Sequence, residues 1–179
     1  MNYCSHCGAK VAFKIPLGDT LPRFVCELCQ VIHYQNPRIV AGCIPEWEDR
    51  ILLCRRAIEP QYGLWTLPAG FMENAETVEQ AAIRETLEEA EADVELTSLY
   101  AVFSIPHISQ VYMMFRAQLR SSDFKAGHES LEVQLFRPED IPWEKLAFRV
   151  IHETLQHYID DRQNNDFRLH TGIILPVVP

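Results

Sequence analysis

The sequence predicts an α/β protein in which a small cysteine-rich segment precedes one compact domain. Two Cys-x-x-Cys pairs lie near the amino terminus, and strand-like apolar runs then surround an acidic helix expected at residues 78–90. The 179 residues, of which 47% are hydrophobic and 23% charged, suffice for one domain with an ample core and a short appendage. We expect three parts, residues 1–34, 35–162 and 163–179.

Four cysteines in the first part have the spacing of a metal site. They are Cys4, Cys7, Cys26 and Cys29. Eighteen residues separate the two pairs, and each pair suits a tight turn that brings two thiolates to one tetrahedral Zn²⁺. We therefore predict a structural zinc ribbon that folds only around its metal, and His6 and His33 are not expected as ligands because four thiolates fill a tetrahedron. Two disulfides or four free thiols are the alternatives, and a reducing compartment disfavours disulfides.

Charge and hydropathy limit the partners of the chain. A net charge of −9 argues against a nucleic-acid surface built on phosphate contacts. No apolar run is long enough to span a bilayer, and Cys4 and Cys7 interrupt the amino terminus where a signal peptide needs an apolar core. We therefore expect a cytoplasmic protein without a membrane partner.

Two strands open the second part. Residues 39–44 and 50–55 have the composition of strands, and a turn at residues 46–49 joins them. Cys43 and Cys54 fall within these strands, so both are expected to be core residues rather than ligands.

A short strand and a loop lead into the acidic helix. Residues 62–67 are rich in aromatic side chains and are predicted as a strand, and a Pro and a Gly then indicate a loop at residues 68–70 with backbone carbonyls to spare. Thr77 followed by Gln80 is a capping box, which predicts a helix from about residue 78 to residue 90.

The helix carries three glutamates within a turn and a quarter, Glu85, Glu88 and Glu89. Glu85 and Glu89 share a stripe with small apolar residues. A second apolar stripe that includes Ile83 and Leu87 lies opposite, so the acids have no clearly solvated face. Like charges four residues apart destabilise a helix by roughly 0.2–0.5 kcal/mol per pair, which a bound cation would relieve. Carboxylates suit Mg²⁺ or Mn²⁺ held against phosphate, and the alternative is an ordinary solvated acidic face.

The remainder of the chain predicts three more strands, a packing helix and a tail. The strands are expected at 95–104 and 110–119, a loop with a strand at 125–136, and the helix at 145–161. We expect His152 and His157 on the surface of this helix. The tail from Gln163 ends in an apolar run without helix or strand pattern, which we place either on the domain or on a second subunit.

Six residues around the helix stand at fixed separations that identify a family resemblance. They are Gly70, Glu76, Arg84, Glu85, Glu88 and Glu89. The spacing is a glycine, five residues, Glu, seven residues, Arg-Glu, two residues and Glu-Glu, and it resembles the signature of the Nudix hydrolases. Thr86, Glu91 and Ala92 depart from its apolar and glycine positions, and the missing glycine at Glu91 puts the carboxyl-terminal cap of the helix in question.

The resemblance extends over nearly the whole chain and implies a fold. The zinc ribbon is followed by QNPR, LLCRR, GLWTLPAG and ESLE, in an order similar to the zinc-ribbon branch that includes bacterial proteins and plant chloroplast FAD pyrophosphatases. The implied fold is an α/β/α sandwich around a mixed sheet.

The resemblance assigns Glu85 and Glu89 as the principal ligands of Mg²⁺ or Mn²⁺. Glu88 would complete the metal shell or position water, and the Ala69 carbonyl would join the shell. The metal would orient and acidify the attacking water and neutralise charge on the diphosphate.

Three further residues receive roles from the resemblance. Glu76 and Arg84 would hold the loop and the helix together rather than act in catalysis. Glu129, on the loop before the strand at the end of 125–136, is favoured over Glu132 as the general base, and the alternative is that either is merely exposed.

The implied activity is hydrolysis of the diphosphate bond in a nucleoside diphosphate derivative. FAD would give FMN and AMP, and ADP-ribose would give AMP and ribose 5-phosphate. Pro106 lies where members that act on ADP-ribose carry a proline, and the sequence array of the NADH-cleaving branch is missing. Homodimers are common in the family, so we expect one here. Aromatic residues available for flat end groups, most of them expected in the core, are Tyr62, Trp65, Phe71, Phe103 and Tyr112.

Two other functional classes remain as alternatives. One is a sensor that binds a nucleotide without turnover, and the intact glutamate set argues against it. The other is a protein that processes RNA ends and grips RNA with its ribbon, and the acidic composition argues against that.

Overall fold

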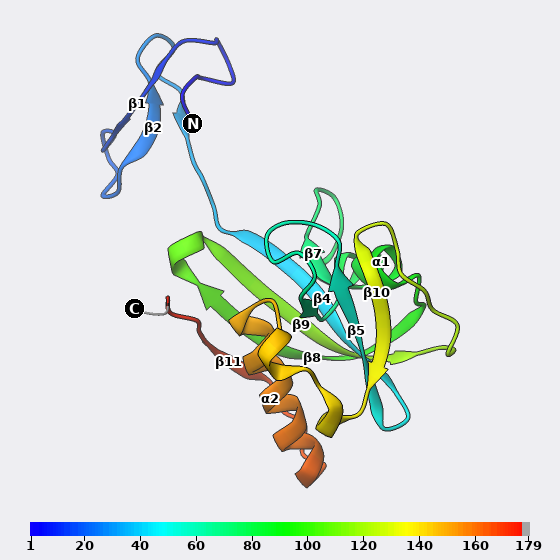
Figure 1. The fold of residues 1–179 in the computed structure, drawn as a ribbon. Coiled ribbons are helices and arrows are strands. Elements are labelled where there is room, and N and C mark those ends of the chain that lie inside the picture. Colours follow the sequence, from blue (N-terminus) through cyan, green and yellow to red (C-terminus); the bar gives the residue numbers. More distant parts are fainter. Residues whose placement is uncertain (177–179) are drawn as a thin grey trace. The chain divides into compact units, whose positions relative to one another are not determined.

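The computed structural model describes residues 1–176. The chain forms two compact units, and the boundary between them in the sequence falls between Pro37 and Arg38 (Figure 1). The first unit is a small antiparallel sheet with cysteine-bearing turns. The second is a larger α/β unit. Within the described residues, no helix has the length and the apolar character needed to cross a membrane.

The first unit has three short antiparallel strands, β1 (Val11–Lys14), β2 (Arg23–Cys26) and β3 (Ile32–His33). A turn follows each cysteine pair, with positive φ at Gly8 (75°) and Gln30 (61°). In each turn the amide of that residue donates to the carbonyl of the first cysteine, Cys4 or Cys26, at 2.9 and 3.0 Å. The two turns therefore have the same local geometry, and the Sγ atoms of Cys4 and Cys29 lie 3.6 Å apart while those of Cys7 and Cys26 lie 3.5 Å apart.

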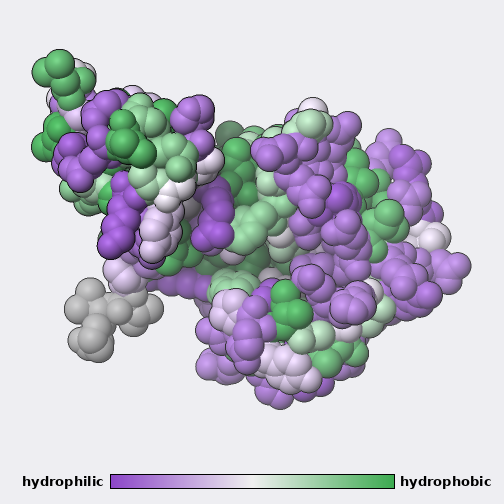
Figure 2. Space-filling view, turned by 90° about the horizontal axis from the view of Figure 1, so that it is seen from above, coloured by the Kyte–Doolittle hydropathy of each residue, from purple (hydrophilic) through white to green (hydrophobic). Residues whose placement is uncertain are grey.

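The Sγ atoms of all four predicted cysteine ligands lie within 4.8 Å of one another. Apart from this cluster, the unit buries little, chiefly Pro16 and Val25. Many of its large apolar side chains are exposed, including Phe13, Leu17 and Tyr34, and hydrophobic surface is visible on this unit (Figure 2). The four thiols thus stand where a larger domain would have its core.

The second unit is built on one mixed sheet. Its strands are β4 (Arg38–Trp47), β5 (Arg50–Arg56), β6 (Trp65–Thr66), β7 (Ala69–Phe71), β8 (Val94–Ile105), β9 (Gln110–Leu119), β10 (Ser130–Phe136) and β11 (His170–Ile173). The order is β10-β5-β4-β9-β8-β11, with β6 paired to β5 and β7 to β4. The β4–β9 and β8–β11 pairs are parallel and the others antiparallel.

Helices cover the two faces of this sheet (Figure 1). They are α1 (Val78–Ala90) and α2 (Arg149–Asn164), and single 3₁₀ turns occur at Pro106–Ile108, Pro138–Asp140 and Trp143–Lys145. Alternate strand residues serve opposite faces: Ile51 and Leu53 pack with α2, whereas Leu52 and Cys54 pack with α1. The predicted α/β fold with a mixed sheet and a preceding ribbon is confirmed.

Helix α1 has the predicted boundaries and capping box, but its outer stripe behaves differently from the prediction. The Thr77 hydroxyl accepts from the Gln80 amide, and the Gln80 side chain accepts from the Thr77 amide. Ile83 and Leu87, predicted as an apolar stripe opposite the acids, are exposed. The helix instead packs through alanines, whose small side chains let it lie close to the sheet.

Local predictions were wrong in three places. The strand expected at 62–67 shortens to two residues, because Gln61 and Gly63 adopt positive φ in a turn. The loop expected at 68–70 contains β7, which pairs with β4. Helix α2 begins at Arg149 rather than at residue 145, since a 3₁₀ turn and an extended segment precede it.

The apolar tail also differs from the prediction. Residues 170–173 form β11, which adds to the sheet beside β8, and Ile174 is buried against the face covered by α2. The strand pattern was hidden because Gly172 and Thr171 interrupt the apolar alternation. The last three residues of the tail, 177–179, lie outside the described residues.

Candidate active site

The carboxyl-terminal end of α1 is held without the glycine that such ends favour. Glu91 takes the left-handed conformation (φ 45°, ψ 34°), and its amide donates to the Leu87 carbonyl at 2.8 Å. The Glu91 carboxylate also pairs with Lys125 Nζ at 2.9 Å. Glu91 stands where the Nudix signature has a glycine, and it nevertheless gives the helix end the usual αL geometry.

Gly70 is required by the close approach of Glu85. A Cβ on Gly70 would lie 2.3 Å from Glu85 Oε2, well inside van der Waals contact. The Glu85 carboxylate is thus pressed against the backbone of β7. Burial raises the pKa of Glu85, and the neighbouring Arg84 opposes this shift.

Arg84 connects β7, the loop after it and α1. Its Nε and Nη2 atoms donate to the two oxygens of Glu76 at 3.1 and 2.8 Å, and Nη2 also donates to the Phe71 carbonyl at 3.1 Å. Nη1 contacts Glu85 at 2.7 Å and Glu88 at 3.0 Å. The hydrogen bonds from Arg84 hold the pKa of Glu76 below its usual range. A single guanidinium therefore holds the segment before the helix in place and orients Glu85 and Glu88.

Glu89 is a buried acid with an unsatisfied oxygen. It is only 7% exposed, and its Oε2 atom has no hydrogen-bond partner among the described residues. Burial, followed by the negative charge of Glu85, raises the pKa of Glu89 to about 8, while Arg56 acts in the opposite direction. A buried polar atom of this kind normally has a partner, so the site calls for a cation or a proton.

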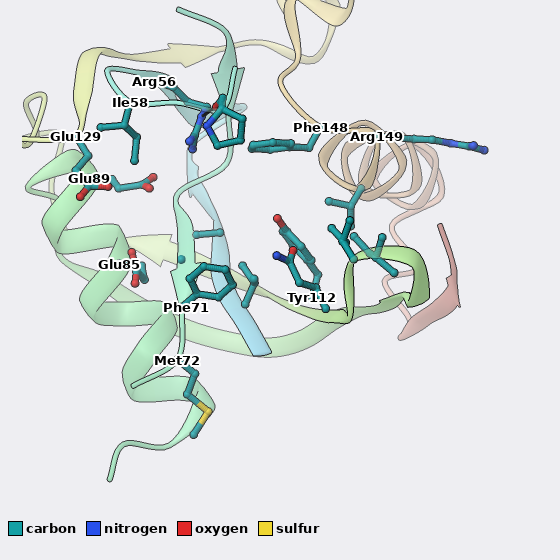
Figure 3. A pocket seen from close by; sticks show the side chains of 18 of the residues that line it. Arg56, Ile58, Phe71, Met72, Glu85, Glu89, Tyr112, Glu129, Phe148 and Arg149 are labelled. Carbon is teal, nitrogen blue, oxygen red and sulfur yellow. Dashed lines mark hydrogen bonds between the residues drawn. The ribbon is translucent and has the colours of Figure 1, made fainter. Parts of the chain in front are cut away.

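The arrangement of acids fits a divalent cation. Figure 3 shows Glu85, Glu89 and Glu129 along one wall of a cavity. Glu85 and Glu89 are largely removed from solvent, whereas the Glu88 side chain is 58% exposed at the rim. Clustered carboxylate oxygens, one of them without a partner, are the donors that Mg²⁺ or Mn²⁺ prefers. Ala69 lies in β7 and also lines the cavity.

The loop that bears Glu129 is fastened to the end of α1. The Lys125 and Gly127 amides donate to the Ala90 and Glu89 carbonyls, each at 3.0 Å. A Cβ on Gly127 would lie 1.7 Å from the Glu88 carbonyl oxygen, so no other residue fits there without a shift of the backbone. This contact brings Glu129 to the wall that carries Glu89, while Glu132 points from β10 to Arg55 at 3.5 Å.

A cavity of about 970 Å³ lies beside the acids. Its walls come from β4, β7, α1, β9, the turn after β8, the loops after β5 and before β10, the start of α2 and the segment after β11. Phe71 and Tyr112, two of the five aromatic residues singled out in the sequence, line it, and Trp65 and Phe103 are core residues as expected. Tyr62 is exposed and does not line the cavity. Pro106 begins the 3₁₀ turn whose His107 and Ile108 line the cavity.

Sequence reasoning missed several residues of the cavity. Arg56 and Phe148 were not singled out, and Ile174 and Leu175 of the tail were not placed at the site. The double arginine of LLCRR was the available signal for Arg56, because a strand end is a common position for functional side chains. Nothing in the local sequence marks Phe148 or the tail, since both reach the cavity only through the tertiary fold.

The comparisons with known proteins agree with this architecture. The family model of the NUDIX domain matches residues 36–157, and the model described as Nudix N-terminal, a zinc ribbon, matches residues 2–35. The crystal structure of a NUDIX hydrolase from Nitrosomonas europaea has a TM-score of 0.95 and 59% identity, and the match covers 98% of this chain and 100% of that one.

Two curated relatives are similar over part of their length. An ADP-ribose pyrophosphatase of Methanocaldococcus jannaschii is 34% identical over 121 residues, which are 64% of this chain and 69% of that protein. The NAD-capped RNA hydrolase NudC of Photobacterium profundum is 31% identical over 149 residues, which are 82% of this chain and 50% of that protein. The chain thus spans about half the length of this NudC. With its glutamate cluster, mixed sheet and amino-terminal ribbon, the chain belongs to the Nudix hydrolase family and carries the Nudix zinc ribbon.

Proposed function

We propose that the chain hydrolyses the diphosphate bond of a nucleoside diphosphate derivative, with ADP-ribose as its foremost substrate. The observation that carries the proposal is the buried Glu89, which lines a cavity of about 970 Å³ and whose Oε2 atom has no hydrogen-bond partner among the described residues. Pockets for small molecules commonly measure 300–1,000 Å³, so this cavity has room for a nucleoside diphosphate and its second sugar. The site thus combines acids that hold a divalent cation with space for the substrate beside them.

Each residue of the site has its own role in the proposed hydrolysis. Bound Mg²⁺ or Mn²⁺ would offset the charge of the diphosphate and lower the pKa of water. Glu85 and Glu89 would hold the cation, with Glu88 and the Ala69 carbonyl as further ligands. Water forms a new bond to one phosphorus, the anhydride bond from that phosphorus breaks, and the other phosphate leaves. Glu129 would accept the proton of the water.

Two observations favour ADP-ribose as the substrate: the turn that Pro106 opens beside the cavity, and one relative. His107 and Ile108, in the turn opened by Pro106, line the cavity. The relative from Methanocaldococcus jannaschii that shares 34% identity is an ADP-ribose pyrophosphatase. The products would be AMP and ribose 5-phosphate. FAD is the second substrate of the same class, with FMN and AMP as products.

A second candidate activity is the hydrolysis of NAD-capped RNA. A NudC of Vibrio atlanticus matches over 90% of the chain, so that match includes part of the ribbon as well as the α/β unit. The ribbon carries Lys10, Lys14 and Arg23. Arg23 lies over the Tyr34 ring at 5.2 Å, and cations beside aromatic rings are features of single-strand RNA surfaces.

The proposal includes a homodimer. Strand β11 is an end strand of the sheet among the described residues, and Ile173 and Leu175 at its end are exposed. An end strand with exposed apolar residues suits pairing with a second copy. The mass of the protein in solution, measured by light scattering, checks this.

Product analysis tests the proposed activity. The protein is incubated with Mg²⁺ and an equimolar mixture of ADP-ribose, FAD and NADH, with NAD-capped RNA in a parallel reaction, and the products are separated by chromatography. We expect AMP and ribose 5-phosphate first. Earlier appearance of FMN would make FAD the substrate, and binding of ADP-ribose without any product would indicate a sensor. Repeating the assay with Mn²⁺ identifies the preferred cation.

A further inference from the structure

Among the residues that the structure describes, three arginines line the cavity, and one of these three is free to bind an anion. Arg84 is held by three glutamates and the Phe71 carbonyl. Arg149 pairs with Glu153 at 3.3 Å, and its side chain extends away from the cavity (Figure 3). Arg56 has no carboxylate partner among the described residues.

Arg56 is fixed in place by its backbone and by one side-chain nitrogen. It is the last residue of β5, its amide donates to the Leu64 carbonyl, and its carbonyl accepts from the Gly63 amide, each at 2.9 Å. The Nε atom donates to the Pro60 carbonyl at 2.9 Å, and the guanidinium lies over the Phe148 ring at 5.1 Å. The loop after β5 and the start of α2 therefore hold the guanidinium from two sides.

The terminal nitrogens of Arg56 remain available to a ligand. A guanidinium has five N–H groups, and only the Nε–H has an acceptor among the described residues. Figure 3 shows the side chain of Arg56 reaching into the cavity, with Phe148 on one side and the acids on the other. Its charge acts on both Glu89 and Tyr112, which stand on different walls. A half-buried cation with four free donors thus faces the middle of the cavity.

We propose that Arg56 binds the diphosphate of the substrate and holds it against the acidic wall of α1. The class of ligand, a diphosphate, rests on the proposed function. Glu85, Glu88, Glu89 and Glu129 place four carboxyl groups on one wall of the cavity, so an anionic substrate needs a cation on its other side as well as the metal. A planar guanidinium held in advance matches the geometry of two phosphate oxygens and loses little entropy on binding.

A purely structural role would give a different result. In that case Arg56 would serve only to hold the loop at Pro60 against Phe148, and its replacement would lower stability and weaken every ligand alike. Binding to phosphate instead predicts a loss that depends on the charge of the ligand. Adenosine and ADP-ribose separate the two cases, because both carry the nucleoside and only ADP-ribose carries the diphosphate.

The experiment compares Arg56→Gln, Arg56→Lys and the matched control Arg55→Gln in the full chain. Arg55 is the exposed neighbour, which pairs with Glu132 and donates to the Gly63 carbonyl, and it does not line the cavity. Calorimetry measures the Kd of ADP-ribose and of adenosine without divalent metal, and steady-state kinetics measure kcat and KM with Mg²⁺. Melting temperatures identify loss of structure.

We expect Arg56→Gln to raise the Kd and the KM of ADP-ribose by about 10- to 100-fold, the range for hydrogen bonds to a charged group, and to leave the Kd of adenosine within about twofold. Arg56→Lys should recover part of this loss because it keeps the charge, and Arg55→Gln should resemble the wild type. Equal losses for adenosine and ADP-ribose, or no advantage of Lys over Gln, would overturn the proposal. If the wild type binds ADP-ribose without cleaving it, the proposed function fails while the binding comparison still decides the role of Arg56.

Discussion

The cysteines of the ribbon and the glutamates of α1 are both proposed as clusters of metal ligands, but the structures around them differ. The four thiols lie within 4.8 Å of one another in a unit that buries little else. The glutamates stand on a helix packed against a sheet with a hydrophobic core on each face. The comparison teaches that a metal can be part of the fold in one unit and an addition to a finished fold in the other.

Removal of zinc should have the largest effect on structure, and it should be confined to the ribbon. Structural zinc contributes about 10–16 kcal/mol in small zinc modules, more than a unit with so small a core can supply. We expect a chelator, or Cys26→Ser, to abolish amide protection in residues 1–37 in hydrogen exchange. Protection of the sheet and of α1 should remain. An unchanged ribbon after zinc loss would contradict a structural metal.

Replacement of a glutamate ligand should have the opposite profile, with activity lost and the fold kept. Glu89→Gln replaces a buried acid, whose charged form is disfavoured there, with a neutral side chain of similar size, so the melting temperature should stay the same or rise. We expect the turnover of ADP-ribose to fall by more than about 100-fold, since even outer-shell partners of a metal are worth 10–100-fold. Cys43→Ser, a buried position on the same side of the sheet that bears no ligand, serves as the control. An active Glu89→Gln would refute the ligand assignment.

Disruption of the contact between Gly127 and α1 should lower both the stability and the activity of the α/β unit. Gly127→Ala places a methyl group on the Glu88 carbonyl, so we expect a loss of about 1–3 kcal/mol in the free energy of unfolding, measured with urea. Activity should fall as well, because the loop that holds Glu129 moves. Gly63→Ala meets no atom within 4 Å and is strained only by its φ of 79°, about 1–2 kcal/mol. Full activity in Gly127→Ala would show that the loop position is not critical.

The sequence allowed good prediction of features that depend on local spacing. The capping box at Thr77 and the boundaries of α1 follow from contacts between residues close together in the chain, and the cysteine cluster follows from the spacing within each Cys-x-x-Cys pair. The features it missed depend on distant pairing: β7 on β4, β11 on β8, and the Gly127 loop on the end of α1. Arg56 belongs to the second group, because its contact with Phe148, far along the chain, depends on the tertiary fold. Local periodicity carries no information about such partners.

The smallest predicted effect concerns Asp161, a charged residue of the α/β unit that lies outside the proposed metal site. Asp161, on α2, accepts from the Tyr100 hydroxyl at 3.0 Å and lies 2.7 Å from His170 Nε2 on β11. Burial alone would raise the pKa of Asp161, and the hydrogen bonds from His170, Tyr100 and the Arg168 amide outweigh it, so this pKa lies below its ordinary value. The carboxylate therefore fastens β11, and the tail that lines the cavity, to α2.

The lowered pKa of Asp161 determines how its contribution to stability depends on pH. The stabilisation by Asp161 is fully present above the unfolded-state pKa of about 4 and is lost as the pH falls through the lower folded-state value. We expect Asp161→Asn to lower the melting temperature by a few degrees at pH 6, and the gap to the wild type should close toward pH 3. Asp160→Asn, at an exposed position that accepts one hydrogen bond from Gln156, should show no such closure. A gap that stays constant across this range would mean that Asp161 acts through packing rather than through its charge.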